Sequence, residues 1–353
     1  MGFKVCKFGG SSLADGKAVQ AVSNVLKRDE ERRYILPSAP GKRFQGDVKV
    51  TDLLYAYFRF CSASDKRADG VFEEICARFE EIADPFGLSA YAREELLSVR
   101  KELTKSEAYC ASRGEWLTAK ILSKGWDLPF VDAEKLPLFQ GDGFDANCFP
   151  AVQNELKNYP KAVVPAFYGV NEKGEIKTFS RGGGDVSGAI IARALSADLY
   201  ENWTDVSGVY ECDPKIVRSA KRIPVLSYRE LAEFSRSGAC VLHGETLSVL
   251  DGSKIPVYIV NTFAPEKDGT LVVPSERKEK KFLGVACKKD GELYKISLIG
   301  KGNEAQRRRL LSLLRRKGVS FVRVEIRDLS IGVLLEKRFY QVAIKEIYKE
   351  FFG

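Results

Sequence analysis

The sequence predicts an α/β protein, in which a three-layer αβα sandwich around a mostly parallel sheet precedes a smaller ferredoxin-like α+β sandwich. Two observations support this class. Strand-like and helix-like segments alternate through the first three quarters of the chain, which is typical of a parallel sheet covered by helices. The C-terminal residues instead follow the order ββαββα, which gives a ferredoxin-like sandwich if its first strand takes the place of the missing last one.

The larger part is predicted to extend over residues 1–274. Its opening elements are a strand at 3–8, a helix at 15–28 and a strand at 33–37. The pattern then becomes almost wholly helical, because apolar residues recur at i, i+3 and i+4, and this predicts a helical lobe at about 52–125. The alternation resumes with a strand at 162–168, a helix at 185–196 and strands at 198–203 and 255–260.

The smaller part is predicted at 282–353, after a linker at 275–281. The linker follows Pro274, is rich in charge and lacks apolar anchors. Two strands, at 282–287 and 292–299, are joined through Asp290-Gly291, a dipeptide typical of hairpins. A helix, two strands and a closing helix are predicted to follow, at 303–316, 319–326, 329–335 and 339–352.

Composition narrows the class of protein. The 353 residues are 44% hydrophobic and 29% charged, which suits a globular protein of more than one domain. No apolar run reaches the roughly 20 residues of a membrane span, and the first residues lack the apolar core of a signal peptide. We therefore expect a cytoplasmic protein that does not bind membranes. The eight cysteines include no Cys-x-x-Cys pair, so no metal site and no disulfide framework is expected.

The net charge of +8 raises the question of nucleic acid. Two basic clusters, at 307–309 and 315–317, lie at helical spacing without interleaved aromatic residues or a recognisable nucleic-acid motif. They are predicted to form a solvated helix face. Nucleic acid is therefore not an expected partner, and the charge suits anionic small substrates equally well.

A glycine-rich loop between the first strand and the first helix is a candidate phosphate site. In Lys7-Phe8-Gly9-Gly10-Ser11-Ser12 the glycines let backbone amides approach an anion, the helix N-terminus adds positive potential, and Lys7 neutralises charge. A simple turn would give the same pattern. The loop matches neither Gly-x-x-x-x-Gly-Lys-Ser/Thr nor Gly-x-Gly-x-x-Gly, so a different phosphate-binding fold is required.

Two further segments carry polar residues suited to an amino acid and a nucleotide. In the glycine-rich loop at 179–185, Arg181 can clamp a carboxylate through two hydrogen bonds and Asp185 can pair with an ammonium group. The segment 203–215 leaves a strand with Thr204-Asp205 and continues to Asp213-Pro214-Lys215. Alone it is a strand end with a turn, but together with the two loops it is a candidate nucleotide site.

Taken together, the motifs resemble those of aspartate kinases, in the amino-acid kinase superfamily. The resemblance runs in order over about 3–274, and the C-terminal part is similar to the ACT domains that these kinases carry. The motifs that carry it are Lys7-Phe8-Gly9-Gly10-Ser11-Ser12, Ser112-Arg113-Gly114-Glu115, Phe167-Tyr168-Gly169, Ser180-Arg181-Gly182-Gly183, Trp203-Thr204-Asp205-Val206 and Asp213-Pro214-Lys215.

The resemblance implies ATP with Mg²⁺ and L-aspartate as ligands, 4-phospho-L-aspartate as the product, and a first step toward lysine, threonine and methionine. Lys7 and Asp185 would be the catalytic residues. ATP and its phosphates would contact Lys7, Phe8, Gly9, Gly10, Ser11, Gly182, Gly183, Thr204, Asp205, Tyr210, Asp213 and Lys215. Aspartate would contact Thr51, Glu115, Arg181 and Asp185. A carboxylate nucleophile is already ionised at neutral pH, so the reaction needs no general base and the single histidine, His243, is expected to be structural.

Three departures from the family pattern bear on this interpretation. Gly184 replaces the common serine after Arg-Gly-Gly, so a hydroxyl contact is lost. Cys240 stands where these kinases often have a lysine near the nucleotide, which is predicted to weaken ATP binding unless Lys215 compensates. Finally, the strands at 282–287 and 292–299 follow each other too closely to admit a second, inserted ACT domain, so feedback by lysine or threonine is not expected.

Other functions fit parts of this pattern. The chain could act on another carboxylate, such as glutamate, acetylglutamate or carbamate, or on a nucleoside monophosphate. It could also be a catalytically weak regulatory subunit that binds amino acids, or an aspartate kinase of a specialised pathway. ACT-type sandwiches usually pair through sheet edges, so a homodimer is expected.

Overall fold

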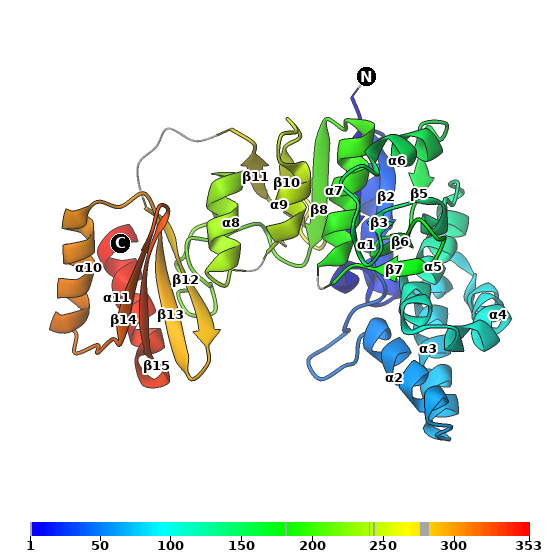
Figure 1. Cartoon of the computed structure of the whole chain (residues 1–353), viewed down its shortest axis with the longest axis horizontal. Helices are drawn as coiled ribbons and strands as arrows, with labels where there is room; N and C mark the ends of the chain where they lie inside the picture. Colours follow the sequence, from blue (N-terminus) through cyan, green and yellow to red (C-terminus); the bar gives the residue numbers. More distant parts are fainter. Residues whose placement is uncertain (1, 181, 240, 243, 276–281) are drawn as a thin grey trace. The chain divides into compact units, whose positions relative to one another are not determined.

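The computed structural model describes residues 2–180, 182–239, 241–242, 244–275 and 282–353. Its contacts divide the chain into two compact units (Figure 1). Unit 1 comprises Met1–Asp205 and Ser248–Lys267, and unit 2 comprises Val206–Leu247 and Asp268–Gly353. Most of the linker predicted at 275–281 lies outside the described residues, so the domain boundary at 274 stays a prediction.

Unit 1 is built on five parallel strands in the order β5-β2-β1-β8-β10. Helix α7 packs against β1 and β8, and α5 packs against β2 and β5. Val5, Cys6 and Phe8 on β1 are fully buried, because helices cover a parallel sheet on both faces. The strands are β1 (Lys4–Phe8), β2 (Arg32–Pro37), β5 (Ala162–Val163), β8 (Leu199–Thr204) and β10 (Val257–Asn261).

Two helices of unit 1, α1 and α5, begin at polar side-chain caps. Asp15 accepts a hydrogen bond from the amide of Ala18 at the start of α1, and Ser106 does the same for Tyr109 at the start of α5. Helices α2 to α5 occupy the region in which the helical lobe was predicted, at about 52–125. The helices are α1 (Gly16–Lys27), α2 (Val50–Ser62), α3 (Arg67–Ala83), α4 (Ser89–Val99), α5 (Glu107–Trp126), α6 (Phe149–Leu156) and α7 (Gly183–Leu195). Helix α9 (Gly244–Leu250) begins in unit 2 and ends in unit 1.

The prediction of a single strand at 162–168 is wrong. This segment contains two strands, β5 and the start of β6 (Tyr168–Val170), and β6 forms a separate hairpin with β7 (Ile176–Thr178). Pro165 has no amide hydrogen for a ladder, and Phe167 has φ of 76°, which no strand residue adopts. A second small hairpin, β3 (Phe139–Gln140) with β4 (Gly143–Phe144), was not predicted.

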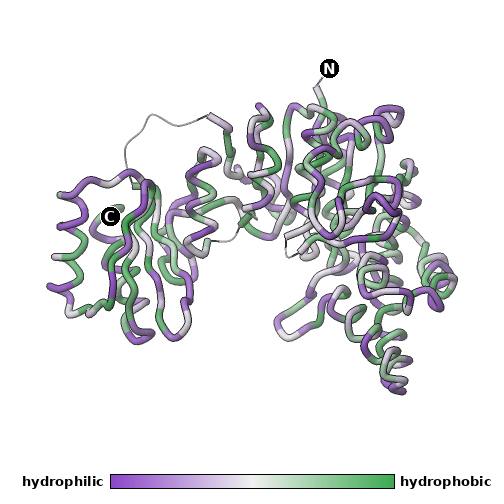
Figure 2. The backbone as a smooth tube through the Cα atoms, in the orientation of Figure 1, coloured by the Kyte–Doolittle hydropathy of each residue, from purple (hydrophilic) through white to green (hydrophobic). Residues whose placement is uncertain are grey.

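Unit 2 combines a parallel pair of strands with a four-stranded antiparallel sheet in the order β12-β13-β15-β14. The hairpin predicted at Asp290-Gly291 is confirmed, since Asp290 pairs with Leu293. In Figure 2 the colour of α10 alternates between hydrophilic and hydrophobic, as an amphipathic helix on a sheet requires. The elements are α8 (Tyr228–Arg236), β9 (Val225–Ser227), β11 (Thr270–Val273), β12 (Phe282–Asp290), β13 (Leu293–Gly300), α10 (Glu304–Arg316), β14 (Arg323–Arg327), β15 (Ser330–Glu336) and α11 (Tyr340–Phe352).

The fold class predicted from the sequence is therefore confirmed: a mostly parallel sheet with helices, followed by an antiparallel α+β unit. Among the helices of the described ranges, none has the length and apolar character needed to cross a bilayer.

Candidate active site

A cavity of about 1000 Å³ opens in unit 1 at the carboxyl ends of β1, β2 and β8. Parallel sheets commonly bind ligands at this end of their strands. Eleven of the sixteen predicted site residues line the cavity: Lys7, Gly9, Gly10, Ser11, Thr51, Glu115, Gly182, Gly183, Asp185, Thr204 and Asp205. Residues from five separate segments of the sequence thus meet in one place.

Five predicted residues are not among those that line this cavity. Phe8 is fully buried and its ring stacks on Trp203 at 5.8 Å, so it supports the phosphate loop from the core. Arg181 lies outside the described residues, as do Cys240 and His243. Tyr210, Asp213 and Lys215 belong to unit 2, and their nucleotide role stays a prediction.

An ion pair joins the phosphate loop to the second glycine-rich loop. The Lys7 amine lies 2.6 Å from Oδ1 of Asp185, and both side chains are largely buried. Oδ1 of Asp185 also accepts a hydrogen bond from the Asn202 amide at 3.1 Å. Lys7 and Asn202 are register partners on β1 and β8, so the sheet itself directs both side chains to the first turn of α7.

The phosphate loop is fixed through its backbone. The amide of Gly9 donates to the Trp203 carbonyl at 2.9 Å, and the amide of Ser12 donates to Gly9 at 3.0 Å. A Cβ on Gly10 would lie 2.9 Å from the carbonyl oxygen of Ala39, so only glycine fits this close approach. The arrangement exposes a short backbone segment next to the Lys7 amine, as a phosphate site requires.

Glu115 is a buried carboxyl at the other side of the cavity. Oε1 accepts a hydrogen bond from the Ala39 amide at 3.0 Å, whereas Oε2 has no partner within the described residues. Burial raises the pKa of Glu115 from its ordinary value of 4.5 to about 8, and the Ala39 hydrogen bond and the nearby Lys7 charge offset only part of this effect. An unpartnered buried oxygen that borders a cavity is suited to a donor group of a ligand.

The raised pKa of Glu115 predicts how the stability of the native protein depends on pH. The unfolded chain ionises Glu115 near pH 4.5 and the native protein only near pH 8, so native stability falls as the pH rises through this window. Glu115→Gln keeps the neutral shape and should unfold at a higher temperature than the wild type, by a margin that grows from about pH 5 to about pH 8. Thermal unfolding at a series of pH values measures the margin.

The exposed Glu107 on the same helix provides a matched control. Glu107→Gln should follow the wild-type pH dependence. A constant difference between Glu115→Gln and the wild type across the whole range would contradict the assignment of a protonated Glu115.

Gly184 stands beside the ion pair. A Cβ at this position would lie 3.2 Å from the Ser38 hydroxyl and 3.3 Å from Cε of Lys7. The serine hydroxyl that aspartate kinases commonly have here is absent, but Ser38, at the end of β2, brings a hydroxyl to the same place. Sequence reasoning did not identify Ser38, because a single serine after a strand carries no distinctive signal.

Other residues of the cavity were also missed. Lys42, Lys49, Asp52 and Tyr55 come from the loop after β2 and the start of α2. Asn202, which holds Asp185 from β8, was missed as well. It is 2% exposed, but β8 also contains the polar Glu201 and Thr204, so its residue type alone carries no distinctive signal.

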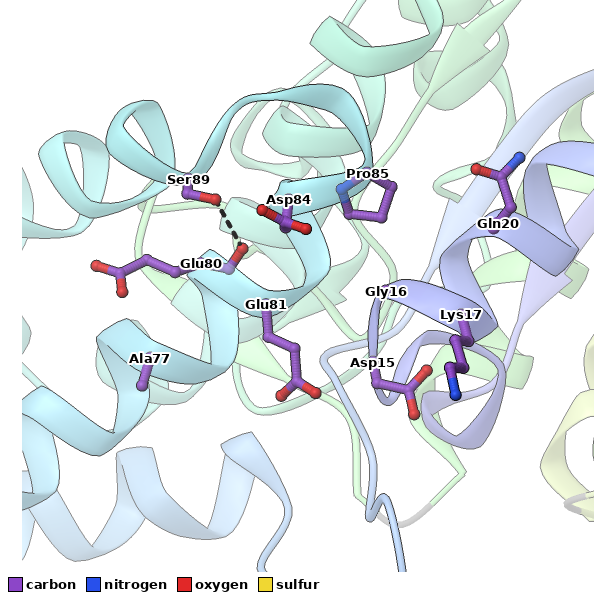
Figure 3. Close-up of a pocket in the computed structure, with 10 residues that line it drawn as sticks. All are labelled: Asp15, Gly16, Lys17, Gln20, Ala77, Glu80, Glu81, Asp84, Pro85 and Ser89. Carbon is purple, nitrogen blue, oxygen red and sulfur yellow. Dashed lines mark hydrogen bonds between the residues drawn. The ribbon is translucent and has the colours of Figure 1, made fainter.

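A second cavity of about 810 Å³ lies between the start of α1 and the end of α3, and none of the predicted site residues borders it. Figure 3 shows the side chains of Asp15, Lys17, Glu81 and Asp84 around the same space. Its acidic residues form no group of three metal-ligating side chains within the described ranges.

A family model for the amino acid kinase family matches residues 2–261, and the chain belongs to this family. It is 34% identical to aspartokinase 3 of Bacillus subtilis over 287 residues, which covers 76% of this chain and 63% of that protein. It is 32% identical to the aspartokinase of Chlamydia pneumoniae over 285 residues, with coverage of 76% and 62%. The chain thus spans about three fifths of the length of these curated relatives.

Solved structures give a similar result. The aspartate kinase of Clostridium acetobutylicum superposes with a TM-score of 0.87 at 29% identity. The superposition covers 99% of this chain and 100% of the Clostridium chain. Aspartokinase III of E. coli, in complex with aspartate and ADP, superposes with a TM-score of 0.69 at 23% identity. The superposition covers 95% of this chain and 79% of the E. coli chain, and it shows that the two share a fold. The resemblance to aspartate kinases drawn from the motifs is confirmed.

Proposed function

We propose that the chain is an aspartate kinase, which transfers the γ-phosphoryl group of ATP to the side-chain carboxylate of L-aspartate and forms 4-phospho-L-aspartate and ADP. The observation that carries this proposal is that a cation at a phosphate-binding loop and a buried carboxyl suited to an ammonium group border the same cavity. The Lys7–Asp185 pair adjoins the phosphate loop, and Glu115 borders the same space with an oxygen that has no partner in the described part of the chain. The aspartate and ADP in the E. coli structure support the choice of ligands.

The reaction requires positioning and charge neutralisation more than proton transfer. A carboxylate oxygen of aspartate attacks the γ-phosphorus, and the bond from that phosphorus to the bridging oxygen of ADP breaks. The nucleophile is already ionised, so no base is needed. Lys7 and the amides of the phosphate loop stabilise charge on the transferring group.

Glu115 and Asp185 are assigned to the ammonium group of aspartate. A buried neutral carboxyl can lose its proton when a cation arrives beside it, because the new charge compensates for burial. Thr51 is assigned to the same substrate, and Arg181 to its α-carboxylate. For the nucleotide, Thr204, Asp205, Tyr210, Asp213 and Lys215 remain the proposed contacts.

Mg²⁺ fits this site as an ion carried by the nucleotide. The described residues hold no cluster of three ligands for a metal ion. Mg²⁺ commonly keeps several waters and binds substrate phosphates with one or two carboxylates, and the exposed Asp205 at the cavity is the carboxylate that we assign to it. When bound, it would neutralise phosphate charge.

A coupled assay of ADP release tests the proposal. ATP and Mg²⁺ are supplied with aspartate, glutamate, acetylglutamate or carbamate in parallel, and the acyl phosphate is trapped with hydroxylamine. ADP and hydroxamate should form with aspartate and at most weakly with the others. Preference for another carboxylate, or no turnover with any, would overturn the proposal.

Regulation gives a separate prediction. Strand β12 passes into β13 through a tight turn at Gly291 and Glu292, which leaves no inserted domain between these two strands. We therefore expect lysine and threonine, each at millimolar concentration, to leave the initial rate nearly unchanged. Strong inhibition by either amino acid would show that the C-terminal sandwich has an effector site without the inserted domain.

The cellular setting follows from the proposed reaction. We propose a cytoplasmic homodimer that supplies the first step toward lysine, threonine and methionine. Neither a nucleic acid nor a membrane is a proposed partner.

A further inference from the structure

The loop between β2 and α2 approaches the phosphate loop through its backbone. We call residues 41–49 the lysine loop; it lies in the blue segment that leads into α2 in Figure 1. The amide of Gly41 donates to the Gly10 carbonyl at 2.8 Å. A Cβ on Gly41 would lie 2.5 Å from the carbonyl carbon of Gly10, so the two backbones touch and only glycine fits. The start of the lysine loop is therefore held next to the phosphate site.

A buried arginine, Arg78, also holds the lysine loop through hydrogen bonds to its backbone. Arg78 on α3 is 1% exposed and donates to the carbonyls of Gly41 at 2.5 Å and Val48 at 2.8 Å, near the two ends of the loop. Its guanidinium lies 3.3 Å from the carboxylate of Asp47. Arg43 donates to the same carboxylate and, as the main cause, holds the pKa of Asp47 well below its usual range. One arginine thus fixes both ends of the loop.

Two cations of the lysine loop reach the active-site cavity without a partner. Lys42 and Lys49 line the cavity, and neither amine has a hydrogen-bond or ion-pair partner within the described residues. Lys7, by contrast, already lies 2.6 Å from Asp185. The cavity must accept ATP together with a carboxylate substrate, and an unpaired lysine amine is a point charge suited to phosphate and carboxylate oxygens.

We propose that the lysine loop supplies the substrate-binding cations that Lys7 alone cannot provide, with Arg78 as the residue that positions the loop. Lys42 directly follows Gly41 and is assigned to the terminal phosphates of ATP. Lys49 directly precedes α2, whose first turn carries Thr51, and is assigned to the carboxylate substrate. The proposal rests on the proposed kinase function and adds two binding residues to its site.

Steady-state kinetics of Lys42→Gln and Lys49→Gln test this assignment. Each variant loses one charge-assisted hydrogen bond, so we expect a rise of roughly tenfold in one KM with a smaller change in kcat. The affected KM should be that of ATP for Lys42→Gln and that of aspartate for Lys49→Gln. Arginine at either position should restore most of the affinity.

Lys17→Gln is the matched control. Lys17 is an exposed lysine of the same unit, its amine has no partner within the described residues, and it borders the second cavity instead. It should leave both KM values unchanged. The proposal is overturned if Lys42→Gln and Lys49→Gln match this control within about twofold, a difference below the worth of one such hydrogen bond.

Two further measurements separate this inference from the proposed function. If the wild type forms no ADP with aspartate, the kinase proposal fails, and calorimetric titration with ATP and Mg²⁺ still tests Lys42: equal affinity of Lys42→Gln and the wild type would overturn its role. Gly41→Ala must push the loop away from Gly10, so its kcat should fall even though both lysines remain. An unchanged kcat would show that contact between the loop and the phosphate site is unimportant.

Discussion

Lys7→Ala is expected to lower kcat by roughly a thousandfold or more, because it removes the one described cation that is fixed beside the phosphate loop. Among the described cations that line the cavity, no other is held in place by an ion pair. Lys42 and Lys49 lie on a separate loop and are assigned to binding. Single-turnover measurement of acyl phosphate at saturating ATP separates this loss from weaker ATP binding.

The same substitution has a structural side effect that a control must address. Without Lys7, the Asn202 amide is the one side-chain donor that the Asp185 carboxylate keeps within the described residues. Thermal unfolding of Lys7→Ala should therefore accompany the kinetics, and Lys7→Arg retains the charge with a different shape. Near-normal phosphoryl transfer in a folded Lys7→Ala protein would show that the phosphate site is wrongly assigned.

The fold was predictable from the sequence where periodicity was strong. The helices α1, α7, α10 and α11 and the strands β1, β2 and β8 lie within two residues of their predicted bounds. Prediction failed where the chain leaves the main sheet. The apolar run at 162–168 suggested one strand, but Pro165 and the left-handed Phe167 redirect it into a hairpin.

The site was predictable where it consists of glycine-rich loops, and not where it depends on tertiary contacts. Gly9, Gly10 and Gly183 could be placed by pattern, because close backbone approach selects glycine. Asn202 reaches the site only through strand register. Lys42 and Lys49 lie in a loop with no periodicity, and its position depends on Arg78, which is distant in sequence. The unusual pKa of Glu115 likewise follows from burial that only the fold reveals.

Arg78→Met is expected to lower the free energy of unfolding by about 3–5 kcal/mol, the cost of removing one partner from a buried, hydrogen-bonded charge network. The substitution leaves the carbonyls of Gly41, Val48 and Ala14 without this donor, and the buried Asp47 without one of its two guanidinium partners. Chemical denaturation monitored by circular dichroism measures the loss. The KM for ATP should rise in parallel if the lysine loop also moves.

Arg67→Gln is the control for this experiment, because Arg67 is an exposed arginine whose carboxylate partner is its near neighbour Asp65. Such surface pairs contribute about 0–1 kcal/mol, so its stability should stay close to that of the wild type. Arg78→Lys tests the geometry, since one ammonium cannot reach both ends of the loop as a guanidinium does. If Arg78→Lys has wild-type stability and wild-type KM values, charge alone suffices and the guanidinium does not position the loop.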